Sequence, residues 1–212
     1  MLSSKITQRK RNMSNKTTYK VGSAFAVFAV LLSPVIASAA TNSGTTTVNA
    51  NITSTIAITT NATITIGLAP TTSTALTSVA DTVSVATNTS NGYALKLSDG
   101  DTTTNLANGA SNIAAHTGTF ASPTALATNT WGYRIVGQGG FTGTAYSAET
   151  NATSSTSTWA GVASSASPQT IKTTAGPAAS DPTTVWYAAK VDTSIPSGAY
   201  TDTVTYTAVT NS

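Results

Sequence analysis

Residues 185–191 read Val-Trp-Tyr-Ala-Ala-Lys-Val, and this alternation predicts a β-strand with one face in a core. Trp186 and Lys190 fall on the opposite face of that strand. Turn-forming residues flank it, with Asp181-Pro182 before and Pro196-Ser197-Gly198 after. The core-facing row of this strand would comprise Val185, Tyr187, Ala189 and Val191.

The same period of two recurs along the chain, and no window of similar length shows a helical pattern. We therefore expect an all-β fold, an antiparallel β-sandwich of Ig-like or fimbrial type with about 8–10 strands. The stretches 102–130 and 137–180 are expected to be long loops that carry short strands and the recognition surface. Further alternating rows lie at residues 48–52, 56–58, 64–66, 83–85, 93–97, 131–135 and 204–208.

The first forty residues have the organisation of an export signal. Six basic residues without an acid precede a 12-residue apolar run, residues 21–32, and the small residues Ala37-Ser38-Ala39 follow. This arrangement predicts a helical signal peptide over residues 1–40, cleaved after Ala39 or Ala40. The apolar run is too short for a permanent membrane span, which needs about 20 residues. Residues 41–212 are then a single β-sandwich domain, outside the cell or on its surface.

Removal of the signal would reverse the net charge of the chain. From Thr41 onward four basic residues face seven acidic ones, so the balance is 4 − 7 = −3. A nucleic-acid-binding domain needs a basic patch, so the sequence argues against a nucleic-acid partner. The chain has no cysteine, and no later apolar stretch is long enough for a membrane anchor. We expect no integral anchor after signal removal.

Side chains suited to catalysis are scarce. His116 is the single histidine and Glu149 the single glutamate, and no Gly-x-Ser-x-Gly motif is present. We expect an exposed loop histidine, no cofactor and no enzymatic activity.

Two sets of residues are candidates for binding. Asp99-Gly100-Asp101 is either a polar hairpin turn, the favoured interpretation, or a weak calcium site, because calcium takes clustered oxygen ligands. Trp186 and Trp159 are either core residues or a platform on which a sugar ring stacks. Trp186 is the better candidate for the platform, since its parity places it on the face opposite the apolar row.

Residues 88–95, 130–133 and 196–204 resemble segments of secreted β-sandwich surface proteins from candidate-phylum (Saccharibacteria-like) bacteria. The last segment is also similar to the final strands of spore-coat-U-type and fimbrial domains. More distantly, the set resembles WxL-type cell-wall domains. The resemblance implies a non-enzymatic structural or adhesive surface protein, and a carbohydrate- or cell-wall-binding module is the alternative.

Residues 45–58 follow the expected cleavage site and have two interpretations. Their alternation, with Val48, Ala50 and Ile52 on one side, predicts the first strand of the domain. Alternatively, the segment adds as a strand to a neighbouring subunit, because unpaired strand edges accept further strands. The expected partners are therefore a second copy of the chain or cell-wall glycans.

Overall fold

The computed structural model describes residues 42–71 and 73–212, and the predicted signal peptide with its cleavage site at Ala39 or Ala40 lies outside them. Residues 50–212 form one compact unit, which holds all the strands. The described residues contain eleven strands and no helix, so the expected all-β class is confirmed. Accordingly, no helix suited to crossing a membrane is found in this part of the chain.

The strands form three sheets. The largest has six strands in the order β1 (Ile56–Thr59), β2 (Ala75–Thr87), β10 (Ala178–Val191), β7 (Thr130–Arg134), β5 (Ser111–Ala115) and β4 (Leu106–Asn108). The second has three strands in the order β11 (Val204–Thr210), β3 (Tyr93–Asp99) and β9 (Gln169–Thr173). The third pairs β6 (Thr124–Ala125) with β8 (Thr158–Trp159).

Strand pairing is antiparallel except between β5 and β7, which run parallel. The expectation of a purely antiparallel fold is wrong at this pair. Residues 116–129 separate the two strands, which is long enough for the crossover that a parallel pair requires. The stretch 102–130 thus contains three strands, β4 to β6, each too short for alternation to reveal.

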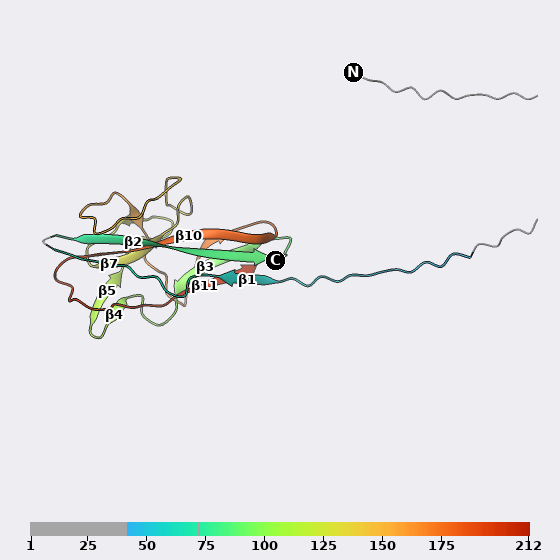
Figure 1. Ribbon diagram of the computed structural model, residues 1–212, viewed down its shortest axis with the longest axis horizontal. Helices are drawn as coiled ribbons and strands as arrows, with labels where there is room; N and C mark the ends of the chain where they lie inside the picture. The colour runs from blue at the N-terminus through green and yellow to red at the C-terminus, as the bar shows by residue number, and fades with distance from the viewer. Residues whose placement is uncertain (1–41, 72) are drawn as a thin grey trace, which may run out of the picture. The chain divides into compact units, whose positions relative to one another are not determined.

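Strands β2 and β10 are the longest strands of the six-stranded sheet and pair side by side along nearly all of β2 (Figure 1). Tyr187 lies opposite Val79, and Val191 lies opposite Ala75. The first four residues of β2, Ala75–Ser78, are buried on both faces although two of them are polar. They therefore lie beneath a second layer, which the alternation pattern does not reveal.

The main core draws side chains from both the six-stranded and the three-stranded sheet. Val83, Val85, Leu95 and Leu97 have no exposed area. The apolar row of residues 185–191 is buried as expected, and so are Trp131, Tyr133 and Ile135. Burial of these alternating rows confirms the face assignment made from the sequence.

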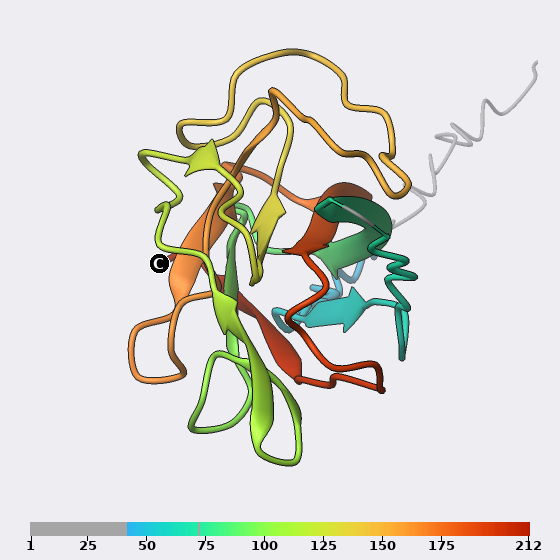
Figure 2. The same cartoon turned by 90° about the vertical axis from the view of Figure 1, so that its left-hand side faces the viewer.

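A smaller apolar cluster lies on the other face of the six-stranded sheet, under the segment 136–157 that connects β7 to β8. The segment is held to β2 by backbone hydrogen bonds between Leu76 and Ala152. Figure 2 shows it, in yellow and gold, as a long arch beside the sheets. The buried members of this cluster are Leu76, Leu126, Trp159 and Ala188.

The row at residues 48–52 is not a strand. Residues 42–55 have no regular secondary structure, and Val48 and Ile52 are each 87% exposed. Ile64 and Ile66 also lie outside any strand, although they pack against the main core. Alternation by itself does not make a strand, because the N–H and C=O groups must find a neighbouring strand.

Candidate functional site

Trp186 and Trp159 meet on the outer face of the six-stranded sheet, around Tyr146. The ring centre of Tyr146 is 4.9 Å from that of Trp186 and 5.6 Å from that of Trp159, and both contacts are edge-on. Arg134 on β7 lies directly opposite Trp186 on β10, so both side chains project from the same face. We call Arg134, Tyr146, Trp159 and Trp186 the outer-face cluster.

Tyr146 is held in place by polar contacts with β2 and its own loop. Its hydroxyl donates to the Glu149 carboxylate at 2.7 Å and lies 2.9 Å from the Ser78 hydroxyl. The backbone N–H of Glu149 donates to the same Ser78 oxygen at 2.9 Å. Burial and the nearby Glu149 carboxylate raise the pKa of Tyr146, so its hydroxyl stays a neutral donor.

The two tryptophans of the expected platform differ in exposure. Trp159 has no exposed area and packs in the small apolar cluster, so it has no ring face for a sugar. Of the two interpretations, Trp159 is a core residue, because Leu76, Leu126 and Ala188 pack around it and Tyr146 of the arch lies edge-on to its ring. Trp186 is half-buried and, as its parity predicts, lies on the face opposite the apolar row.

Arg134 is the buried cation of the cluster, with 6% of its surface exposed. Its guanidinium carbon lies 4.4 Å from the ring centre of Tyr146 and 5.8 Å from that of Trp159. Burial lowers the pKa of Arg134, electrostatic interactions with Tyr146 and Glu149 raise it, and an arginine stays protonated.

The guanidinium has no polar partner in the part of the chain that the structure describes. Among the described residues no hydrogen bond reaches it, and the one ion pair joins Lys172 to Asp181. A desolvated cation–π contact contributes about 2 kcal/mol. Removing an ion from water costs several kcal/mol, so the aromatic rings compensate only part of this.

Sequence reasoning missed Arg134 and Tyr146 as members of the cluster. Arg134 follows Tyr133 with the parity of the solvent face, which is where an unremarkable surface arginine also lies. Arg134 joins the cluster because β7 pairs with β10, which puts it opposite Trp186. Local alternation does not reveal which strands pair.

The acidic candidates Asp99 and Asp101 gain a third member, Asp202, which lies 101 residues further along than Asp101. One carboxylate oxygen from each falls within 4.8 Å of the others. Burial, followed by the charges of Asp99 and Asp101, raises the pKa of Asp202 to about 6, and its Oδ2 is sealed without a partner. Calcium takes six to eight oxygens, and three close carboxylate oxygens fall short of that number.

His116 is buried, with 6% of its surface exposed, so the expected exposed loop histidine is wrong. Its Nε2 lies 2.9 Å from the Thr124 hydroxyl, and its Nδ1 accepts from the backbone N–H of Ala127 at 3.5 Å. Burial lowers the pKa of His116. His116 directly follows β5. Gly118 lies against its ring and Gly132 against its Cβ, and the lack of a side chain at both glycines leaves room for it.

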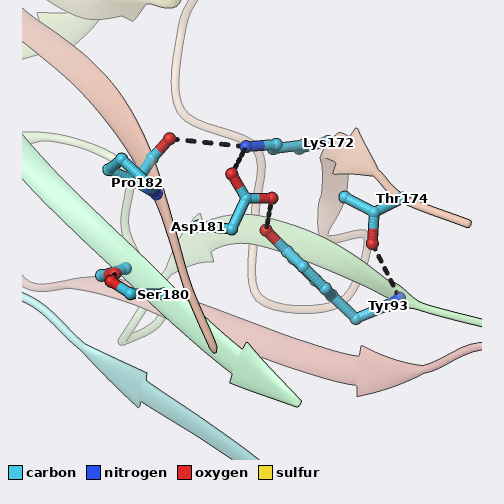
Figure 3. A network of polar contacts seen from close by, with 7 residues as sticks. Tyr93, Lys172, Thr174, Ser180, Asp181 and Pro182 are labelled. Atoms are coloured by element: carbon cyan, nitrogen blue, oxygen red, sulfur yellow. Dashed lines mark hydrogen bonds and ion pairs between the residues drawn. The ribbon is translucent and has the colours of Figure 1, made fainter. Parts of the chain in front are cut away.

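A second polar network links the three-stranded sheet to β10. Figure 3 shows Asp181 between Lys172 and Tyr93. The Tyr93 hydroxyl donates to one Asp181 oxygen at 2.7 Å, and the Lys172 ammonium donates to the other at 2.6 Å. Partial burial by itself would raise the pKa of Asp181, but the hydrogen bonds from Lys172 and Tyr93 lower it.

A hollow of about 970 Å³ opens beside β11. Its walls come from residues 60–70 and 193–206 and from the main-core face of β10. Ile64, Ile66 and Leu68 line one side, and Val204 and Tyr206 of β11 line another. The hollow is lined by both apolar and polar side chains and lies next to β11, which hydrogen-bonds to β3 alone among the described strands. A surface of this kind is suited to an added strand.

Comparison with protein-family models, with curated proteins and with solved structures finds no match to this chain.

Proposed function

We propose that this protein is an exported, non-enzymatic structural or adhesive subunit of the cell surface, which associates with further copies by strand addition. The observation that carries the proposal is the exposure of Val48 and Ile52, at 87% each, in an alternating segment that has no strand structure. Large apolar side chains at that exposure are stabilised by burial against another surface.

The proposed acceptor is the β11 edge of a second copy, with the hollow beside it. Among the described strands β11 hydrogen-bonds to β3 alone, and β1 lies near it without pairing, so the incoming strand would bond to the backbone groups of β11 that face away from β3. Val48, Ala50 and Ile52 share one face of an extended segment and would enter the hollow. A contact between two different surfaces of identical subunits propagates into an open filament.

Two further parts of the proposal concern architecture and compartment. The shared core of the six-stranded and three-stranded sheets supports a β-sandwich of Ig-like or fimbrial type. The basic and apolar residues of positions 1–40 support export to the surface or the exterior. Sequencing the N-terminus of the secreted protein tests the export, and a secreted chain that still begins before Val21 would contradict it.

The assembly is tested by light scattering on the mature protein over a range of concentrations. We expect multimers, and we expect Val48→Lys with Ile52→Lys to give monomers that melt at the same temperature. The matched control is Thr47→Lys with Asn51→Lys, which adds the same charge to the opposite face of the segment and should leave assembly intact. A mature protein that stays monomeric at high concentration would refute the proposal.

Glycan binding is a second candidate function, and Trp186 is the observation that favours it. Its half-buried ring lies on the outer face next to Tyr146, away from the proposed acceptor edge. We expect Trp186→Ala to abolish any binding to cell-wall glycans without changing assembly. Retained binding in that variant would rule out Trp186 as the platform.

A further inference from the structure

We propose that Arg134 is the anion-binding residue of the outer face, and that it binds saccharides carrying an oxyanion, either a carboxylate or a phosphate. The inference rests on glycan binding as the second candidate function and adds a charge requirement to it. The feature that leads to it is a buried guanidinium that has no polar partner among the described residues.

Arg134 is held rigidly by its surroundings. Its guanidinium lies over the ring of Tyr146 at 4.4 Å, and its strand pairs with β10 at Trp186. Its Nε is buried without a hydrogen-bond partner, and the terminal nitrogens Nη1 and Nη2 are not among the buried unpaired atoms of the described residues. Those two nitrogens form the end of the fork that binds a carboxylate or phosphate through two parallel hydrogen bonds.

The cluster as a whole has more donors than acceptors. Trp159 Nε1 is a second buried N–H group without a partner. Buried donors nearly always have an acceptor in folded proteins. These two donors have no acceptor among the described residues, which leaves a place for an acceptor on a ligand. An oxyanion is an acceptor that also balances the charge of Arg134.

Neighbouring charges leave the fork of Arg134 free. Glu149 is the acid of this region, but its carboxylate accepts from the Tyr146 hydroxyl and makes no ion pair with Arg134. Lys190 lies on the same face of β10 and adds a second positive charge. Trp186 stands opposite Arg134 and provides apolar surface for a sugar ring, so charge and ring are recognised side by side.

The test is calorimetric titration of the purified chain at low salt with three polymers. Polygalacturonate supplies carboxylates, a glycerol-phosphate polymer supplies phosphates, and a neutral glucan supplies neither. We expect an acidic polymer to bind at least about tenfold more tightly than the glucan, and the polymer that does so identifies the oxyanion. Equal binding of all three would overturn the charge requirement while leaving glycan binding in place. Absence of binding to all three would overturn both, and assembly would still be decided by light scattering.

Variants separate the fork from its charge. Arg134→Lys keeps the positive charge but loses the fork, so we expect about a tenfold loss of affinity for the acidic polymer. The matched control Lys96→Gln removes a charge from β3 of the three-stranded sheet, outside the outer-face cluster, and should cost less than about threefold. Arg134→Lys with the affinity of the unchanged chain would overturn the proposal.

A measurement on the unchanged chain needs no variant to fold. Arg134 is the one arginine after Arg11, so the chain cleaved after Ala39 or Ala40 gives a single set of arginine side-chain N–H signals in nitrogen-15 NMR spectra. Addition of monomeric galacturonate should shift these signals. Signals of Arg134 that stay unshifted at saturating galacturonate and glycerol phosphate would refute the site.

Discussion

The two ends of strand β3 place carboxylates in opposite electrostatic surroundings. At its first residue, the Tyr93 hydroxyl donates to Asp181, which also pairs with Lys172 (Figure 3). At its last residue, Asp99 lies close to Asp101 and Asp202, and no cation of the described residues is within ion-pair distance of them. Both arrangements occur along one strand, so the neighbouring elements decide at which end of β3 a cation compensates the carboxylate charge.

The difference sets opposite pH dependences at the two ends. The folded-state pKa of Asp181 is lowered, so its contribution to stability is present above its unfolded pKa and lost as the pH falls through the folded value. The folded-state pKa of Asp202 is raised to about 6, so the folded protein binds the extra proton. Stability therefore falls as the pH rises from about 4, the unfolded pKa, to about 6.

Truncation of Tyr93 should have the largest effect, because its side chain has no exposed area. Tyr93→Ala is expected to lower the free energy of unfolding by about 3–5 kcal/mol, as for other buried aromatic rings. Tyr93→Phe keeps the ring and loses the hydrogen bond to Asp181, which should cost about 1–2 kcal/mol. Urea denaturation measures both, and equal losses would show that the packing of the ring contributes nothing.

Removal of the cation at the compensated end should have the next largest effect. Lys172→Met leaves the partly buried Asp181 with Tyr93 as its remaining side-chain donor, and we expect a loss of about 1–2 kcal/mol at pH 7. Lys96→Met is the matched control, since Lys96 lies on β3 and makes no ion pair with another described residue. A loss in the control as large as that of Lys172→Met would contradict a specific role for the pair.

Neutralisation at the uncompensated end should stabilise the protein. Asp202→Asn keeps an acceptor for the Thr203 N–H and removes a charge close to Asp99 and Asp101. We expect a gain of about 1–2 kcal/mol at pH 7, after allowing for solvent screening of a partly exposed group. The gain should vanish at pH 4, where Asp202 is protonated in the folded protein. Thermal melting at both pH values checks this, and a gain that persists at pH 4 would refute the electrostatic cause.

The smallest expected effect is the loss of stability at low pH that follows from protonation of Asp181. As the pH falls through the lowered pKa of Asp181, the bond to Lys172 weakens, and we expect a loss of at most about 1 kcal/mol because the pair is partly exposed. Stability of the chain and of Lys172→Met should converge at low pH. Parallel pH profiles of the two proteins would exclude the pair as the cause of the acid sensitivity.

The alternating rows were predictable from the sequence because each residue of a strand is buried or exposed according to the face on which its side chain lies. Leu95 and Leu97 face the core, and Lys96 between them does not, since successive side chains of a strand point to opposite faces. The same rule placed Trp186 on the outer face. It was wrong for residues 48–52, where the alternation is present and a neighbouring strand is not.

The candidate sites were less predictable because each joins residues distant in the sequence. Asp202 reaches Asp99 because β11 pairs with β3, with Val204 opposite Asp99. His116 is buried because Thr124 of β6 contacts its ring and its backbone N–H donates to Trp131 of β7, although its local sequence is that of a loop. Trp159 is covered by the arch 136–157, whose sequence is mostly polar and shows no alternation that would predict its position.

The sequence by itself determined the all-β class, the faces of the main strands and the charge balance of the chain, because these follow from local alternation and composition. The tertiary structure alone decided which strands are neighbours. That choice brought Arg134 opposite Trp186, put Lys172 beside Asp181 and left Asp202 without a cation among the described residues. Pairing of distant strands depends on the free energy of the whole sheet, and no short window of sequence contains that information.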